Sequence, residues 1–192
     1  MTKDDIRKQT IEKRDNLSQE EIYEKSRRIF ETLSELDELS DADSILVYAS
    51  MRSEVITDDI ILDCLSRGKK VYCPKVTDKN GGKMEFVRIY AIEELIEGYF
   101  GIREPEIIDT SELYDNSDPD RTVMIMPGVA FDKERDRIGY SGGFYDRYLA
   151  SHEGIRTIAL GFECQITSGV IPVEETDIKP DILLTEERIL GA

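Results

Sequence analysis

Histidine and cysteine are scarce in this chain, which removes several classes of catalytic chemistry. His152 is the only histidine among 192 residues, so most histidine-metal sites and catalytic triads are excluded. Its position near a predicted helix end favours a solvated or structural role. The three cysteines are too few and too far apart to indicate a disulfide framework or a zinc site; they are Cys64, Cys73 and Cys164. We therefore expect a reducing, cytoplasmic compartment.

Long apolar runs and an excess of positive charge are also absent. No run approaches the roughly 20 residues that a membrane-spanning helix needs, and the first 16 residues are charged throughout, so we expect neither export nor a membrane anchor. The net charge of −16 repels nucleic acid and anionic lipid, and we expect neither as a partner. A phosphorylated small molecule remains compatible, because surface charge is screened beyond about 8 Å and a local cluster of cations can dominate a site.

What the chain does contain is an alternation of short apolar runs and helical segments. An apolar content of 40% over 192 residues suffices for one core, so a single domain over residues 1–192 is predicted. Apolar runs predict parallel strands at 44–50, 70–74, 122–126, 156–160 and 181–184. A turn at 79–83 predicts that 84–89 returns as an edge strand, and Tyr99–Pro105 is predicted to be a loop. The sum predicts a three-layer α/β/α fold with a mostly parallel central sheet and an antiparallel edge.

Helix starts are marked by capping signals. Thr2 with Asp5, and Ser18 with Glu21, have capping-box spacing, which predicts helices beginning near residues 3 and 19. Thr57 is the predicted N-cap of a helix over 58–66, and a short helix is expected near 91–96.

Three cations share one face of the first predicted helix. Lys3, Arg7 and Arg14 stand at i, i+4 and i+11, which places them on a stripe about 40° wide. Such a stripe is suited to gripping phosphates. The alternative is an ordinary solvated face, because acidic residues are interleaved along the same helix.

The segment from Pro127 to Tyr148, PGVAFDKERDRIGYSGGFYDRY, carries the most chemical information. Gly139, Gly142 and Gly143 allow the backbone to approach a ligand closely, and successive N–H groups there favour an anion. A buried strand precedes this glycine loop and a helix follows it, so the dipole of the helix also points at the loop. The loop matches neither the phosphate-loop pattern nor the dinucleotide fingerprint, and the residues alone therefore indicate only an anion site.

Three carboxylates are further candidates. Asp146 follows the glycine loop and Asp181 begins a predicted strand; Mg²⁺ between nucleotide phosphates needs only one or two carboxylates plus waters. Glu54 lies in the loop that leaves the first strand, where ligands bind in such sheets. For each of them a helix cap, a turn or a solvated loop residue is the alternative.

The combination of PGVAFD with RIGYSGGFYDR at residues 137–147 resembles the signature of the 5-formyltetrahydrofolate cyclo-ligases, also called methenyltetrahydrofolate synthetases. Weaker pieces follow in the order of that family, so the resemblance spans nearly the whole chain. They are the Lys3 and Arg7 helix start, 48–57, 101–105, 161–165 and 181–185.

The resemblance implies an ATP-dependent and Mg²⁺-dependent ring closure. 5-Formyltetrahydrofolate becomes 5,10-methenyltetrahydrofolate, and ADP and phosphate are released. The implied route phosphorylates the formyl oxygen, lets the nitrogen at folate position 10 attack the activated carbon, and expels phosphate. The protein then has mainly to position the reactants and stabilise charge, which suits a chain without a catalytic histidine or cysteine.

The resemblance also implies residue roles. Arg137 and Tyr140 are the expected catalytic residues. The expected ATP contacts are Lys3, Arg7, the weaker stripe member Arg14, Arg137, Gly139, Ser141, Gly142, Gly143 and Tyr145, with plain packing as the alternative for Tyr145. Asp146 and Asp181 are the expected Mg²⁺ ligands. The expected folate contacts are Glu54 toward the pterin and Ala49, Met51, Tyr140 and Phe144 around the ring.

Three positions depart from the family pattern. Ser141 stands where many relatives have glycine, Phe144 where tyrosine is common, and Thr176 where histidine is frequent. These departures leave the cations and carboxylates in place, so we expect the activity to be retained. We also expect the protein to be a monomer. A non-catalytic nucleotide- or folate-binding protein on the same scaffold is the main alternative, and an acidic interaction domain whose glycine loop is only a tight turn is the second.

Overall fold

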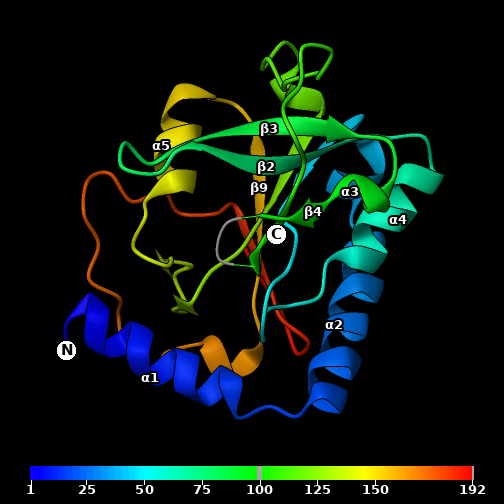
Figure 1. The fold of residues 1–192 in the computed structure, drawn as a ribbon. Coiled ribbons are helices and arrows are strands. Elements are labelled where there is room, and N and C mark those ends of the chain that lie inside the picture. Colours follow the sequence, from blue (N-terminus) through cyan, green and yellow to red (C-terminus); the bar gives the residue numbers. More distant parts are fainter. Residues whose placement is uncertain (99–100, 192) are drawn as a thin grey trace.

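A seven-stranded sheet forms the centre of the protein (Figure 1). The computed structural model describes residues 1–98 and 101–191; Tyr99 and Phe100 of the predicted loop, and Ala192, lie outside the described residues. The strand order is β11-β10-β9-β6-β1-β2-β3. The strands are β1 (Ser44–Val47), β2 (Lys70–Asp78), β3 (Lys83–Ile89), β6 (Thr122–Met126), β9 (Arg156–Leu160), β10 (Ile182–Leu184) and β11 (Ile189–Leu190). Neighbours from β10 to β2 are parallel, whereas β3 and β11 are antiparallel edges.

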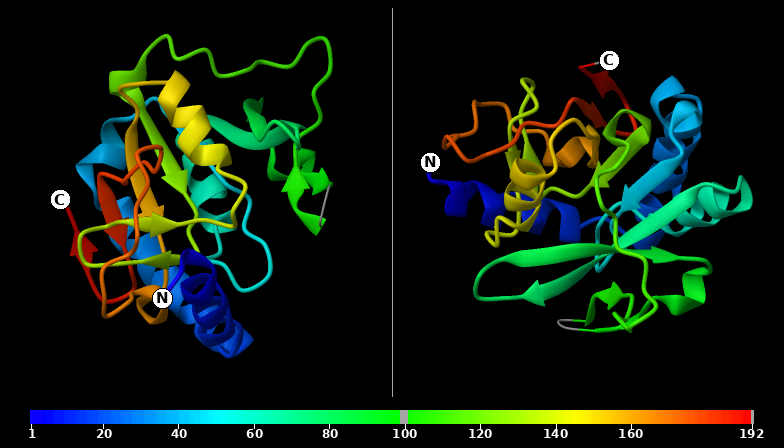
Figure 2. Two further views of the ribbon diagram at one scale, coloured as in Figure 1. Left: turned by 90° about the vertical axis from the view of Figure 1, so that its left-hand side faces the viewer. Right: turned by 90° about the horizontal axis from the view of Figure 1, so that it is seen from above.

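Helices cover both faces of this sheet (Figure 2). The helices are α1 (Lys3–Asp15), α2 (Gln19–Ser34), α3 (Asp37–Asp41), α4 (Asp58–Ser66) and α5 (Phe144–Ser151). On one face, Ile29 and Leu33 of α2 join α3 and α4 in burying residues such as Ile125. On the other face, Tyr148 and Leu149 of α5 pack over side chains from β1, β3, β6 and β9. The predicted three-layer α/β/α fold with an antiparallel edge is therefore confirmed.

The first helix belongs to neither layer and lies across the carboxyl ends of the strands (Figure 1). It packs against η4 (Glu163–Gln165), the 3-10 turn that follows β9. It also packs against a small hairpin of β7 (Ala130–Phe131) and β8 (Arg137–Ile138) that follows β6. Ile6 of α1, Ala130, Ile138 and Ile171 form a separate apolar cluster at this contact. The cations of α1 are thereby placed beside the glycine loop.

The predicted capping signals are confirmed for two helices and in part for a third. Thr2 and Ser18 make complete capping boxes at α1 and α2. Thr57 occupies the N-cap position of α4, which has the predicted bounds, but its side chain makes no capping hydrogen bond. Its hydroxyl instead donates to Tyr48 O at 2.7 Å and accepts from Ser50 N at 3.1 Å, because this buried loop needs partners for its own backbone groups. These bonds fix the 50–57 loop that carries Glu54.

Other boundaries differ from the sequence prediction by a few residues. β1 ends at Val47 rather than at residue 50, and the predicted helix at 91–96 is only the 3-10 turn η1 (Ile92–Glu94). The remaining short elements are β4 (Ile96–Glu97), β5 (Arg103–Glu104) and η3 (Pro119–Arg121). In the described part of the chain, no helix is both long and apolar enough to cross a membrane.

Candidate active site

The β7–β8 hairpin buries Arg137 beside the glycine loop. Only 4% of its side chain is exposed, and its Nη2 lies 2.8 Å from Asp146 Oδ1. Its Nη1 donates to Pro127 O at 3.4 Å, whereas the buried Nε has no hydrogen-bond partner among the described residues. A buried donor without a partner costs about 1–3 kcal/mol. The guanidinium thus retains a donor for the acceptor oxygen of a ligand.

The backbone of the glycine loop requires small or unusual residues at particular positions. Gly143 has a φ of +59° at the start of α5, and a Cβ on Gly142 would lie 2.4 Å from the Phe144 ring. Ser141 has a φ of +79°, a conformation that glycine adopts without strain. The loop therefore leads tightly into the amino end of α5, where backbone donors favour an anion.

Of the three predicted stripe cations, Arg7 binds the backbone of this loop and Lys3 binds acidic residues of the 174–177 segment. Arg7 Nε donates to Gly139 O at 2.8 Å and its Nη1 pairs with Asp4. Lys3 Nζ lies 3.1 Å from a Glu174 carboxylate oxygen and also binds Asp177. Burial lowers the pKa of Lys3, but these two acidic partners outweigh it and hold the pKa above its usual value. The interpretation of this helix face as merely solvated is therefore wrong for Lys3 and Arg7.

Arg14 is the exception, because its guanidinium is buried away from the loop backbone. The residue is only 2% exposed. Its Nε donates to Ser53 Oγ at 3.0 Å and its Nη2 donates to the Tyr140 hydroxyl at 2.6 Å. Arg14 thus connects the 50–54 loop with the Tyr140 side chain of the glycine loop.

Glu54 is a buried carboxylate in the loop that follows β1. It is 5% exposed, and its Oε2 accepts from Met51 N at 2.9 Å. The Tyr140 side chain interacts with it and acts to lower its pKa. Burial raises the pKa of Glu54, while the Met51 N–H and the Arg14 charge act in the opposite direction. A buried acceptor of this kind suits the N–H groups of a planar ligand.

Aromatic and small side chains line the same region. Tyr145 is half-buried and packs against the apolar clusters on both faces of the sheet. Its ring lies edge-on to that of Phe86, with 6.4 Å between the ring centroids. Arg137 Cζ lies 6.0 Å from the Tyr145 ring centre. Phe144 is half-buried and Ala49 is buried. Tyr145 therefore packs and also supports Arg137, so the packing alternative holds in part.

The structure brings one predicted metal ligand to Arg137 and holds the other elsewhere. Asp146 Oδ1 accepts from Ile178 N at 3.0 Å, next to its contact with Arg137. Asp181 Oδ2 instead accepts from Thr157 N at 2.8 Å and Thr157 Oγ1 at 2.9 Å. Its Oδ1 lies 3.4 Å from Arg156 Nη1. Arg156 and Thr157 begin β9, whereas the glycine loop follows the opposite, carboxyl end of parallel β6.

Asp177, which the sequence prediction did not include, lies near Asp146. It binds Lys3, the N–H of the next residue, Ile178, donates to Asp146, and Asp146 binds Arg137. Burial raises the pKa of Asp177, but the bonds from Lys3 and from Glu174 N, together with the charges of Lys3 and Arg137, hold it below its usual value. A lowered pKa favours the ionised form of Asp177, which is the form that a divalent cation requires.

A model of the 5-formyltetrahydrofolate cyclo-ligase family matches residues 1–186. The chain belongs to this family. A probable 5-formyltetrahydrofolate cyclo-ligase of Caenorhabditis elegans is 32% identical over 179 residues, covering 88% of this chain and 85% of the relative. The 5-formyltetrahydrofolate cyclo-ligase of Escherichia coli strain K12 is 32% identical over 150 residues, covering 77% of this chain and 80% of the relative. Membership classes the chain as a ligase of folate metabolism.

Solved structures agree with this cyclo-ligase assignment. The structure of Aquifex aeolicus 5,10-methenyltetrahydrofolate synthetase matches with a TM-score of 0.82 at 29% identity, covering 99% of this chain and 92% of that one. A 5,10-methenyltetrahydrofolate synthetase from Mycoplasma pneumoniae matches with a TM-score of 0.76 at 21% identity, covering 97% and 99% of the two chains. At that identity the second match supports the fold alone.

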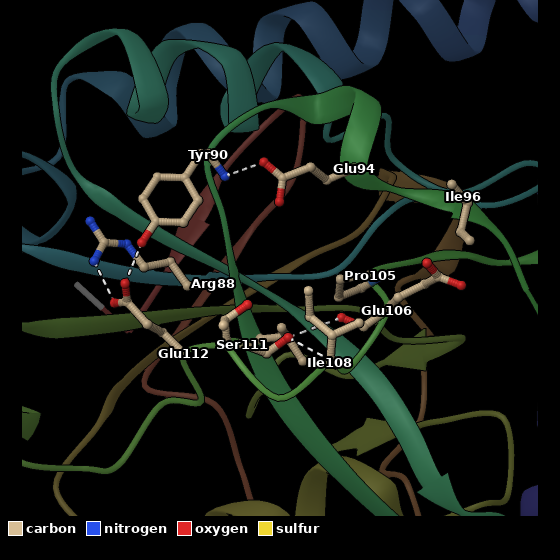
Figure 3. Close-up of a pocket in the computed structure, with 11 residues that line it drawn as sticks. Arg88, Tyr90, Glu94, Ile96, Pro105, Glu106, Ile108, Ser111 and Glu112 are labelled. Carbon is tan, nitrogen blue, oxygen red and sulfur yellow. Dashed lines mark hydrogen bonds and ion pairs between the residues drawn. The ribbon is translucent and has the colours of Figure 1, made fainter.

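A hollow elsewhere on this cyclo-ligase contains none of the predicted site residues (Figure 3). Its volume is about 330 Å³, and it lies between β3, η1 and the 105–112 segment. Arg88 and Glu112 close one side with an ion pair of 2.6 Å, and the Tyr90 hydroxyl also binds Glu112. Glu94 accepts from two backbone N–H groups. Because Arg88 and Glu112 pair with each other and Glu94 binds backbone N–H groups, the hollow adds no residue to the candidate site.

The sequence missed Asp177 and the buried role of Arg14. As a carboxylate in a loop, Asp177 was a candidate partner for a lysine. Because 174 residues separate it from Lys3, the sequence did not show that the two meet. For Arg14 the helical spacing indicated the correct face and could not indicate the depth of burial. Both depend on contacts between distant parts of the chain.

Proposed function

We propose that this protein closes the ring of 5-formyltetrahydrofolate to 5,10-methenyltetrahydrofolate, using Mg-ATP and releasing ADP and phosphate. The observation that carries the proposal is the buried Arg137 beside the glycine loop, with its unpartnered Nε and its ion pair with Asp146. Arg7 binds Gly139 O of the same loop, and Glu54 supplies a buried carboxylate. Family membership gives the substrate class, since the named relatives act on this folate.

The protein residues would divide the work between binding and charge stabilisation. ATP supplies the phosphoryl group that turns the formyl oxygen into a leaving group, so that the nitrogen at folate position 10 can displace it as phosphate. Lys3, Arg7 and the loop backbone around Gly139, Ser141, Gly142 and Gly143 would hold the phosphates. Arg137 would stabilise the charge on the transferring group. Because that chemistry needs no protein nucleophile, the half-buried or buried cysteines take no part in it.

The carboxylates beside Arg137 fit a magnesium ion. Mg²⁺ is held by one or two carboxylates together with waters and phosphate oxygens, and Asp146 with Asp177 offers two. The described residues form no group of three or more acidic, histidine or cysteine ligands, which also suits Mg²⁺ bound mainly through nucleotide. We propose Asp146 and Asp177 as its ligands in place of the pair with Asp181. When bound, the ion would neutralise phosphate charge.

Folate-facing residues would fix the pterin. Glu54 would accept hydrogen bonds from the ring, while Met51, Tyr140 and Phe144 would surround it with Ala49 behind them. Tyr140 would also touch the reacting region, as expected for a catalytic residue. The −16 charge supports the further proposal that the enzyme has no nucleic-acid or membrane partner. The few, widely separated cysteines support the proposal that it is cytoplasmic. We propose that it acts as a monomer.

An absorbance assay tests the function directly. Purified protein mixed with Mg-ATP and 5-formyltetrahydrofolate should produce the absorbance of methenyltetrahydrofolate, and chelation of Mg²⁺ by EDTA should abolish the signal, with recovery on adding excess Mg²⁺. Omission of ATP is the second control. A folded protein that binds the folate or ATP but never turns over would instead support the non-catalytic binding alternative.

Replacing Glu54 by glutamine should weaken folate binding and leave ATP affinity within about twofold. Glutamine keeps the shape but loses a charged acceptor, so a loss of about tenfold to hundredfold in folate affinity is expected. Calorimetric titration of each ligand measures both affinities. A larger effect on ATP would move Glu54 to the nucleotide side.

The same carboxylate should make folate binding sensitive to pH. Burial raises the pKa of Glu54, so wild-type affinity should fall on acidification at a higher pH than for an exposed glutamate, and the E54Q variant should lack this fall. A raised folded-state pKa also means that ionised Glu54 costs stability at neutral pH. E54Q should therefore unfold at an equal or higher temperature, which separates lost binding from lost folding.

A further inference from the structure

Arg14 joins two parts of the site that are distant in the sequence. Its guanidinium lies between the 50–54 loop, through Ser53 at 3.0 Å, and the glycine loop, through the Tyr140 hydroxyl at 2.6 Å. Ser53 in turn donates to Asp15, the neighbour of Arg14 on α1. The Arg14 Cζ lies 5.7 Å from the centre of the Tyr140 ring. Two N–H donors of one guanidinium thus bind side chains on the folate side of the proposed site.

These contacts leave Arg14 poorly placed for a triphosphate. The residue is 2% exposed, in contrast to Lys3 and Arg7, whose side chains are 22% and 17% exposed. A phosphate would have to displace Ser53 or Tyr140, and each buried oxygen would then lose its donor at a cost of about 1–3 kcal/mol. Arg14 therefore has a different role from the two cations that precede it on the helix.

Tyr140 carries the effect of Arg14 to the buried carboxylate. Its hydroxyl accepts from Arg14 Nη2 at 2.6 Å. The same side chain interacts with the Glu54 carboxylate and acts to lower its pKa. Because Arg14 donates to the tyrosine oxygen, the hydroxyl proton is left for another acceptor, and Glu54 is the carboxylate that interacts with this side chain. Glu54 is also held by the Met51 N–H at 2.9 Å, so one of the two groups that act on this carboxylate depends on Arg14.

We propose that Arg14 is a positioning residue for folate, which acts through Tyr140 to orient Glu54 and makes no contact with ATP. The inference rests on the proposed function for the identity of the ligand, whereas the chain of contacts from Arg14 to Glu54 exists in the free protein. It also accounts for a buried charge at the end of α1, because an arginine that only packed there would need no aligned tyrosine hydroxyl and glutamate.

The pKa of Glu54 is a measurable quantity that would not change if Arg14 and Tyr140 only packed against their neighbours. The charged and titratable side chains that face it are Arg14, Arg52, Tyr48, Tyr140 and Tyr145. The Arg14 cation and the Tyr140 hydrogen bond favour the ionised carboxylate. Loss of either should therefore raise the pKa of Glu54 further above its usual value.

The experiment compares Arg14→Gln and Tyr140→Phe with Lys13→Gln as the matched control. Lys13 is an exposed cation on the same helix, so its removal changes the net charge equally. The pKa of Glu54 is followed in the free, full-length protein by carbon NMR of the side-chain carboxyl, assigned by its absence in Glu54→Gln. Affinities for 5-formyltetrahydrofolate and ATP are measured by calorimetry.

R14Q and Y140F should both raise the pKa of Glu54 and weaken folate binding by about tenfold to hundredfold, with ATP affinity within about twofold. The double variant should bind folate no more weakly than the worse single variant, because both act along one route. K13Q should change none of these quantities. If R14Q does not fold, Y140F retains the Arg14 contact to Ser53 and gives the same two readouts.

Three results would overturn the inference. They are a larger loss of ATP affinity than of folate affinity in R14Q, additive losses in the double variant, or an unchanged pKa of Glu54 in both single variants. A wild-type protein that binds no folate would instead refute the proposed function, and the titration, which needs no ligand, would still decide whether Arg14 acts on Glu54.

Discussion

Arg137→Ala should lower kcat by about 10²- to 10³-fold, with a much smaller change in the KM for ATP. The guanidinium is buried and retains an unpartnered Nε beside the glycine loop. Removing one charge stabiliser that acts in the transition state costs about 3–4 kcal/mol of the activation free energy. Steady-state kinetics with saturating Mg-ATP and 5-formyltetrahydrofolate measure the effect, and direct ATP titration shows whether ground-state binding survives.

The ion pair with Asp146 calls for a control of this prediction. Arg137→Ala leaves that carboxylate without its 2.8 Å partner, so a loss of stability has to be separated from a loss of chemistry. Arg137→Lys keeps the charge without the planar fork, whereas Arg137→Gln removes the charge and keeps hydrogen-bonding groups. The melting temperature of each variant is compared with its turnover. If Arg137→Gln is folded and retains near wild-type turnover, the assignment of Arg137 to the transferring group is wrong.

The sequence predicted those features that depend on local patterns. The run at 122–126 is fully buried as β6 with the predicted bounds, because a strand covered on both faces is apolar throughout. Capping boxes at Thr2 and Ser18 formed as their spacing indicates. Helical spacing also placed Lys3 and Arg7 on one face. Each of these rests on residues within a few positions of one another.

What the sequence could not predict depends on distant partners. The strands of the β7–β8 hairpin have only two residues each, which is too short for an alternating pattern. Thr57 has the right position for an N-cap, but its hydroxyl is used by Tyr48 O and Ser50 N in a buried loop. Arg14 meets Tyr140 across 126 residues. In each case tertiary contacts outweigh the local preference.

Residue roles were predictable mainly through the resemblance to a family. Glycine clustering alone indicated an anion site, and the loop position of Glu54 alone did not distinguish a ligand contact from a solvated glutamate. Its 5% exposure shows that it is not solvated. Asp177 and Asp181 lie four positions apart, and only the fold shows which of them meets Lys3 and which meets Thr157.

Asp132→Ala should lower the free energy of unfolding by about 3 kcal/mol and reduce activity as well. Asp132 is 3% exposed, and its carboxylate accepts three backbone N–H groups, from Glu134 at 3.0 Å, Asp136 at 2.9 Å and Ile171 at 2.9 Å. Alanine leaves these donors unpaired, at about 1–3 kcal/mol for a buried one. The turn that they stabilise positions Arg137. Thermal unfolding should shift down by about 10 °C.

Asp136→Asn is the matched control for Asp132→Ala. Its carboxylate lies in the same turn and makes an ion pair of 3.0 Å with Lys179, which is 42% exposed. Such a partly exposed pair contributes at most about 1 kcal/mol, so the melting temperature of D136N should fall by only a few degrees. Urea unfolding of both variants, followed by circular dichroism, compares the two losses. If D132A loses no more stability than D136N, the carboxylate does not hold the hairpin, and the buried position of Arg137 must then depend on the apolar contact of Ile138 with α1.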